Sequence, residues 1–122
     1  MISKNSTYAV VGASKDFKKY GYKVFRDLKK AGYNVIPINP HEKEILGAKV
    51  YKNIFDVNFK IDLVIFVVLP EVAEKVLEDI NKLNIKKVWM QPGSESEKAI
   101  KYCKKNKIKC IHNACIMINK NI

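Results

Sequence analysis

Residues 8–14, Tyr8-Ala9-Val10-Val11-Gly12-Ala13-Ser14, decide the fold into which the rest of the chain must fit. Tyr8 to Val11 form an apolar run without alternation, which is typical of a parallel strand that is buried on both faces. Gly12 then lets the backbone turn and approach a ligand without a Cβ in the way. If a helix follows, its unpaired N–H groups and its dipole favour an anion beyond the strand. The stretch therefore predicts a buried strand that leads into a phosphate-binding turn.

Length and composition predict one domain over residues 1–122. The chain has 122 residues, of which 48% are hydrophobic, and it contains no Gly/Ser-rich linker. The longest apolar run, residues 63–69, is too short to span a bilayer, and the N-terminus lacks the apolar core of a signal peptide. Three cysteines without an export signal indicate reduced thiols. We therefore expect a cytoplasmic protein that does not associate with a membrane.

The net charge of +11 makes this a basic protein, and its meaning depends on how the lysines are distributed. They occur on every predicted helix and in most loops, without interleaved aromatic residues or a dense basic tail. This pattern favours lysine as a general solvating residue. A positive field that attracts a polyanionic small molecule is a second interpretation, and we prefer it to the third, a nucleic-acid-binding module.

The segment after the turn predicts a βαβ unit. Apolar residues from Gly21 to Ala31 recur at the spacing of one helix face, and Gly32 supplies a stop. A second strand follows over residues 33–38 and ends at Pro40. The unit from Thr7 to Ile38 has roughly 30 residues, the size of a right-handed crossover.

The remaining elements continue this alternation of strands and helices. Together they specify an α/β fold with a single doubly wound parallel sheet, Rossmann-like, of about five strands with helices on both faces. Residues 41–58 give a weaker signal, which we interpret as a turn at 44–47, an extended piece at 49–51 and one helical turn at 53–57. The clearer elements are a strand at 62–68, a helix from Pro70, a strand at 87–90, a helix opened by a capping box at 94–97, and a strand at 108–111.

In such a sheet, ligands bind beyond the carboxyl ends of the strands, so these ends form the candidate site. The first turn lacks the dinucleotide motif G-x-G-x-x-G, because Gly12 is followed by Lys15 and Phe17. The second strand ends in Asn39, where NAD-binding proteins place an acid that binds the ribose. His41 and Lys43 follow closely and would tolerate a phosphate there. These residues point away from NAD and towards NADP or coenzyme A.

No catalytic constellation stands out in the sequence. There is no Ser/His/Asp arrangement, carboxylate pair or P-loop lysine motif. Cys103 and Cys110 lie on apolar segments, and their spacing to His112 and Cys115 matches no common zinc pattern, so we expect core packing for both. Cys115 differs because it lies past the last strand, near the expected ligand. We interpret Ser94 and Glu97 only as a helix cap and Trp89 as a core residue.

Taken in order, these segments resemble the CoA-binding Rossmann proteins, the small domain also found at the start of the succinyl-CoA synthetase alpha subunit and of ADP-forming acyl-CoA synthetases. The resemblance covers nearly the whole chain. The segments that carry it are Val10-Val11-Gly12-Ala13-Ser14, Lys19, Gly21-Tyr22-Lys23-Val24, Ile36-Pro37-Ile38-Asn39-Pro40, Glu44-Ile45-Leu46-Gly47, Asp62-Leu63-Val64, Pro70-Glu71, Val88-Trp89-Met90-Gln91-Pro92-Gly93 and Cys115.

The resemblance implies coenzyme A, free or acylated, as the small-molecule ligand, and it implies where the ligand lies. The pyrophosphate would be held at the first turn, the adenosine bordered by the end of the second strand, and the adenine and pantetheine lined by the segment after the third long strand. The residues implied in binding are Gly12, Ala13, Ser14, Lys19 and Tyr22; Asn39 and Pro40; Val68, Leu69 and Pro70; and, at the far side, Gln91 and Gly93.

Two segments depart from the family pattern. Many stand-alone members carry arginines where this chain has Val68-Leu69, and the segment before the last cysteine is usually Asp-Arg where this chain has Asn113-Ala114. The synthetases also use a second domain with a phosphorylated histidine, which nothing after Cys115 could supply. We therefore expect a non-catalytic CoA-binding module, such as a carrier, a sensor or a regulatory partner.

Two other functions stay open, a small NADP-dependent oxidoreductase and the basic nucleic-acid-binding module. A further hypothesis is that Cys115 approaches the pantetheine thiol and forms a mixed disulfide with it.

Overall fold

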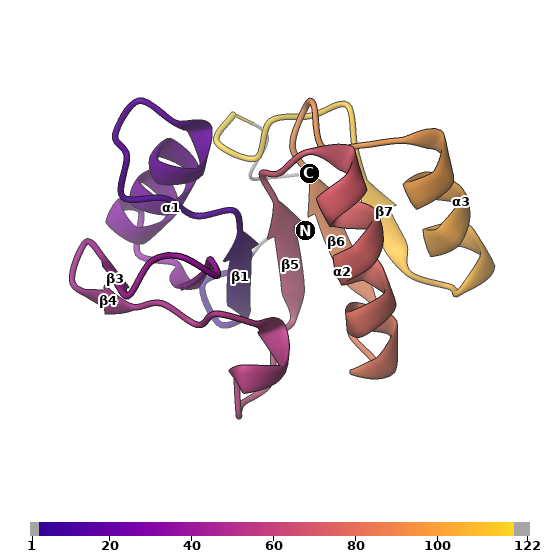
Figure 1. Ribbon diagram of the computed structural model, residues 1–122, viewed down its shortest axis with the longest axis horizontal. Coiled ribbons are helices and arrows are strands. Elements are labelled where there is room, and N and C mark those ends of the chain that lie inside the picture. Colours follow the sequence, from indigo (N-terminus) through magenta and orange to yellow (C-terminus); the bar gives the residue numbers. More distant parts are fainter. Residues whose placement is uncertain (1–2, 119–122) are drawn as a thin grey trace.

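A five-stranded parallel sheet forms the centre of the molecule (Figure 1). The computed structural model describes residues 3–118. The strands run in the order β2-β1-β5-β6-β7, so the chain leaves β1 first towards one edge of the sheet and then crosses to the other side of β1. These strands are β1 (Thr7–Val11), β2 (Asn34–Ile38), β5 (Leu63–Phe66), β6 (Lys87–Met90) and β7 (Lys109–Ile111).

Helices cover both faces of this sheet, which confirms the doubly wound fold. Along β1, Ala9 and Val11 pack in the core cluster that includes residues of α2 and α3, whereas Tyr8 and Val10 pack in the cluster on the α1 side. Both faces of the strand are buried, as the unbroken apolar run predicts. The helices are α1 (Tyr20–Lys30), α2 (Pro70–Lys82) and α3 (Glu97–Lys105).

The weakly patterned segment after β2 contains a short hairpin and one turn of 3-10 helix. The hairpin joins β3 (Glu44–Ile45) to β4 (Ala48–Lys49), and the helical turn η1 spans Ile54–Asp56. Between them Tyr51 makes an isolated parallel bridge with Ile38. The Tyr51 N–H donates to the Pro37 carbonyl and the Asn39 N–H donates to the Tyr51 carbonyl, both at 3.0 Å. The chain after Tyr51 is thereby held beside the carboxyl end of β2.

The start of α3 differs from the sequence prediction. Ser94, expected to cap the helix, is buried, and its hydroxyl accepts a hydrogen bond from the Val68 N–H at 3.0 Å. The cap is Ser96, whose hydroxyl accepts from the Ala99 N–H at 3.0 Å. Both serines fit an N-cap by residue type, and the long-range bond of Ser94 to the β5–α2 loop explains why the chain uses the second one.

Candidate functional site

The carboxyl ends of β1, β2 and β5 meet at the point where the strand order reverses, which is where ligands bind in open α/β sheets. In Figure 1 the loops after β1, β5 and β6 all lie along the upper edge of the sheet. The candidate site is therefore built from loops at one edge of the sheet.

None of the described helices is long and apolar enough to cross a membrane.

Two glycines allow this edge to close tightly. Gly12 has a φ of 97°, and a Cβ there would lie 2.2 Å from the Val67 carbonyl oxygen. A Cβ on Gly21, in the first turn of α1, would lie 1.9 Å from the Gly12 carbonyl oxygen. Gly12 is thus required by its contact with the β5–α2 loop, and Gly21 lets α1 pack onto the turn. From the sequence, Gly12 was expected to let the backbone turn and approach a ligand, whereas Gly21 was expected on the apolar face of the helix and in a segment of the family pattern.

A cavity of about 420 Å³ opens beside this glycine pair, on the side of the sheet covered by α2. Four of the residues predicted to bind the ligand line this cavity, namely Gly12, Asn39, Pro40 and Val68. The other lining residues are Val11, Ile38, His41, Lys52, Asn53, Ile54, Val72, Val76 and Asp79.

The turn after β1 contacts an acid of the chain itself. The Lys15 N–H donates to the Glu42 carboxylate at 2.9 Å, and the Ser14 hydroxyl accepts from the Asp16 N–H at 3.0 Å. Ala13 is fully buried beneath the turn. An anionic group therefore already lies against the backbone of the predicted phosphate turn, and the Ser14 oxygen is used in holding the loop.

Asn39 connects the ends of β1 and β2. Its amide nitrogen donates to the Ala13 carbonyl at 2.8 Å, and its amide oxygen accepts from the His41 N–H at 2.8 Å. The side chain thus fixes the backbone around the cavity in addition to lining it.

A second cavity of about 170 Å³ lies at the same edge and is lined by Tyr20, Val67, Gln91, Pro92 and Cys115. Gln91 is 4% exposed, and its oxygen accepts from the Ile116 N–H at 2.7 Å. Its nitrogen donates to the Cys115 sulfur at 3.4 Å. Gln91 therefore holds the C-terminal segment against β6, and Cys115 lies at the wall of this cavity.

The remaining predicted binding residues lie outside both cavities. Lys19 is exposed at the N-terminus of α1, and Leu69 is 68% exposed just before Pro70, the first residue of α2. Gly93 is exposed, and its N–H donates to the Glu95 carboxylate at 3.0 Å. Tyr22 lines a separate hollow with Arg26, Lys29, Lys30 and Leu46.

Lys52 belongs to the candidate site but was not predicted from the sequence. It lines the large cavity, whereas Lys43, which was expected to tolerate a phosphate, does not. The signal in the sequence was slight, because Lys52 follows a short extended piece whose pairing with β2 is non-local.

Cys103 and Cys110 form a pair between α3 and β7. A hydrogen bond from the Cys103 thiol lowers the pKa of Cys110, and the same bond raises the pKa of Cys103 together with its burial. Cys103 is buried in the core, as expected, and Cys110 packs against it partly exposed. Within the described residues no group of three or more metal-binding side chains is close enough together to hold an ion.

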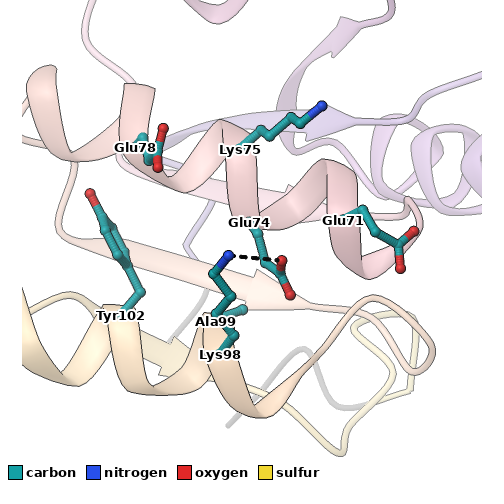
Figure 2. Close-up of a pocket in the computed structure, with 7 residues that line it drawn as sticks. All are labelled: Glu71, Glu74, Lys75, Glu78, Lys98, Ala99 and Tyr102. Atoms are coloured by element: carbon teal, nitrogen blue, oxygen red, sulfur yellow. Dashed lines mark ion pairs between the residues drawn. The ribbon is translucent and has the colours of Figure 1, made fainter.

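A fourth hollow, between α2 and α3, has the wrong charge for a polyanionic ligand. Figure 2 shows Glu71, Glu74 and Glu78 of α2 around it, with an ion pair of 3.9 Å from Lys98 to Glu74. Glu74 also accepts a hydrogen bond from the Ser96 hydroxyl at 2.6 Å, so this carboxylate supports the cap of α3. The acidic residue Glu74 in this hollow therefore has a structural role in joining α2 to α3.

The strand order and the cavity at its switch point define a Rossmann-like α/β domain. The chain belongs to the CoA binding domain family, whose model matches residues 6–121. This confirms the family that the sequence motifs resemble.

Among curated proteins, the chain is similar to an ADP-forming acetate–CoA ligase of Methanocaldococcus jannaschii, with 40% identity over 88% of this chain. The match spans only 15% of that ligase. Bacillus subtilis YneT is 27% identical over 97% of this chain and 87% of its own length. The chain thus resembles both a small part of large ligases and nearly all of a small protein.

Solved structures show the same two kinds of relative. A conserved hypothetical protein from Pyrococcus furiosus superimposes with a TM-score of 0.89 and 36% identity, covering 93% of this chain and 97% of that one. A dinucleotide-forming acetyl-coenzyme A synthetase of Ca. Korarchaeum cryptofilum gives a TM-score of 0.78 and 30% identity, covering 88% of this chain and 25% of that one.

Proposed function

We propose that this protein binds coenzyme A, free or acylated, across the carboxyl edge of its sheet and does not itself catalyse acyl transfer. The observation that carries the proposal is the cavity of about 420 Å³ at the switch point, lined by Gly12, Asn39, Pro40 and Val68, in a chain of the CoA binding domain family. Cavities of this size and position are the usual nucleotide sites of open α/β sheets.

The two cavities suit the two ends of the ligand. The adenosine would occupy the large cavity, the pyrophosphate would cross the turn at Gly12, and the pantetheine would enter the small cavity towards Cys115. Val67 and Val68 are consecutive residues that line different cavities, so one elongated molecule can reach both. This placement leaves the thiol end of the ligand at the wall that Cys115 forms.

The side chains at this edge of the sheet favour binding of the ligand over catalysis. Among the residues that the structure describes in the two linings, His41 and Cys115 belong to different cavities, and no serine is present to pair with His41. A nucleophile and its base need to lie within hydrogen-bonding reach of each other. We therefore propose a carrier, sensor or regulatory partner.

We also propose that the protein acts in the cytoplasm. Its three cysteines, all within the described residues, form no disulfide, and thiols persist in reducing compartments.

Calorimetric titration with CoA, NADP and a short DNA duplex tests the function. We expect CoA to bind selectively and Val72→Trp, which fills the cavity from α2, to weaken binding at least tenfold. Leu83→Trp is the matched control, because Leu83 is 40% and Val72 42% exposed and both lie at α2. Absence of CoA binding would overturn the proposal, as would equal affinity for NADP, which favours the oxidoreductase. Tight binding of DNA with a steep salt dependence would favour the nucleic-acid-binding module.

Cys115 allows a covalent test of where the thiol end lies. The Cys115 thiolate would attack one sulfur of CoA disulfide, forming a protein–CoA mixed disulfide and releasing one CoA thiolate. Mass spectrometry after incubation with CoA disulfide should show one CoA adduct in the wild type and in Cys110→Ser, but none in Cys115→Ser. An adduct that persists unchanged in Cys115→Ser would exclude this placement.

A further inference from the structure

We propose that Lys52, assisted by His41, recognises the phosphate on the adenosine ribose, and that this pair makes the protein distinguish CoA from dephospho-CoA. The inference rests on the proposed function, because it assigns a role within the same cavity. It concerns two residues that line the cavity on the side of β2.

The backbone places Lys52 beside the end of β2. Tyr51 pairs with β2 through the bonds to Pro37 and Asn39, as a short parallel extension of the sheet. Lys52 is the next residue, so it reaches the carboxyl edge alongside Asn39. His41 comes to the same place because its N–H is bonded to the Asn39 side chain at 2.8 Å.

This position is the one that faces the adenosine ribose in related folds. In doubly wound nucleotide-binding sheets the residue at the end of the second strand contacts the ribose, and a cation nearby accommodates a ribose phosphate. Asn39 occupies the ribose position here. Lys52 and His41 therefore lie where the extra phosphate of CoA would be, whereas the pyrophosphate belongs at the turn after β1.

The charge of Lys52 is available to a ligand. None of the ion pairs recorded within residues 3–118 engages Lys52. The acidic residue in the described lining is Asp79, contributed by α2, whereas Lys52 and His41 come from the β2 side. A doubly charged phosphate next to an ammonium group and an imidazole would gain charge-assisted hydrogen bonds that dephospho-CoA cannot make.

Calorimetric titrations with CoA and dephospho-CoA, at one ionic strength, test this assignment. We expect the wild type to bind CoA about tenfold more tightly, the effect of one charge-assisted contact. Lys52→Met should remove most of this preference by weakening CoA and leaving dephospho-CoA unchanged. His41→Gln should reduce the preference by a smaller factor. Lys43→Met is the matched control, since Lys43 is an exposed lysine of the same connection outside the cavity lining, and it should keep the full preference.

The outcomes separate this inference from the proposed function. If the wild type binds both ligands equally, or if Lys52→Met keeps the preference, the inference is wrong while CoA binding stands. If the preference disappears in Lys43→Met and not in Lys52→Met, the inference is wrong, and Lys43 is the lysine that meets the ribose phosphate, as the sequence predicted. If CoA does not bind at all, both proposals fail. Circular dichroism of each variant ensures that a lost preference is not a lost fold.

Discussion

The carboxyl edge of the sheet has two unlike halves. In the open half, formed by β2, β1 and β5, the strand ends border a cavity of about 420 Å³. In the closed half, formed by β6 and β7, polar side chains hold the C-terminal segment in place. Gln91 bonds to Ile116 and Cys115, and the Trp89 ring N–H donates to the Ala114 carbonyl at 2.8 Å.

The difference shows how a polar residue at a strand end acquires its role. Gln91 and Ser94 are 4% and 2% exposed, and each accepts a hydrogen bond from a backbone N–H of a distant segment. His41 and Lys52 are exposed and border a cavity. Position in the chain predicts both groups equally well, whereas burial separates the side chains whose polar atoms are bonded to the protein backbone from those that are exposed at a cavity.

Breaking the wall of the open half should have the largest effect. Gly21→Ala would push a Cβ to 1.9 Å from the Gly12 carbonyl oxygen, so we expect a loss of about 3 kcal/mol in the free energy of unfolding. Gly93→Ala should cost only about 1 kcal/mol, because its φ is 97° but no atom lies within 4 Å of the new Cβ. Urea denaturation of both variants measures the difference, and equal losses would contradict the close packing of α1 on the turn.

Opening the closed half should have the next largest effect. Gln91→Met keeps the length of the side chain but leaves the Ile116 N–H without its acceptor, and we expect a loss of about 2 kcal/mol. Alkylation of Cys115 should become faster because its segment is no longer held. Pro92→Ala, at an exposed neighbour in the same cavity, should change neither quantity. An unchanged alkylation rate in Gln91→Met would show that other contacts hold the segment.

Ser94 connects the two halves and allows a sharper test. Ser94→Ala removes the acceptor of the Val68 N–H, so we expect a loss of about 1.5 kcal/mol and several-fold weaker CoA binding. Ser96→Ala should cost about 1 kcal/mol through its lost cap and leave CoA affinity unchanged. Denaturation and calorimetry measure both, and a loss of affinity in Ser96→Ala alone would contradict our assignment of the two serines.

The cysteine pair gives a pH-dependent prediction at the closed half. Because the Cys103 thiol donates to Cys110 and lowers its pKa, the Cys110 thiolate should form at a lower pH than an ordinary thiolate. The midpoint of its alkylation rate against pH should therefore lie below the usual range. Cys103→Ala removes the donor and should raise the midpoint. A midpoint that does not move would show that the bond between the thiols is absent in solution.

The smallest effect concerns the carboxylate at the phosphate turn. Glu42→Gln removes a negative charge from the Lys15 N–H, so we expect CoA to bind about threefold more tightly, as for a surface charge worth less than 1 kcal/mol. Glu44→Gln, an exposed acid in the nearby hairpin, is the control and should have no effect. Calorimetric titration with CoA measures the affinity of both variants. Weaker binding in Glu42→Gln would mean that this side chain supports the loop more than it repels the ligand.

The sequence predicted the fold closely because its signals are local. The strand at 87–90 was predicted with the bounds that β6 has, since an apolar run between a lysine pair and a Gln-Pro-Gly turn has few alternatives. The family and the positions of Gly12, Asn39, Pro40 and Val68 at one cavity followed from motifs at strand ends.

Non-local contacts explain what the sequence could not supply. Lys52 reaches the cavity only because Tyr51 pairs with β2, and no pattern within residues 41–58 encodes that bridge. Ser94 and Ser96 are both acceptable caps, and the bond to Val68 decides between them. The need for a glycine at position 21 depends on the carbonyl of another turn. Each of these contacts joins segments that are distant in the chain.

The bridge at Tyr51 also affects how the protein behaves at high concentration. An open parallel sheet ends in two strands with unpaired backbone groups, which can recruit strands of other chains and start aggregation. On one side, the Pro37 carbonyl is already bonded to Tyr51, and Pro37 itself offers no N–H for further pairing. On the other side, β7 has only three residues and begins with Lys109. Both borders of the described sheet therefore offer few groups for edge-to-edge pairing, and the segment that positions Lys52 also covers part of one border.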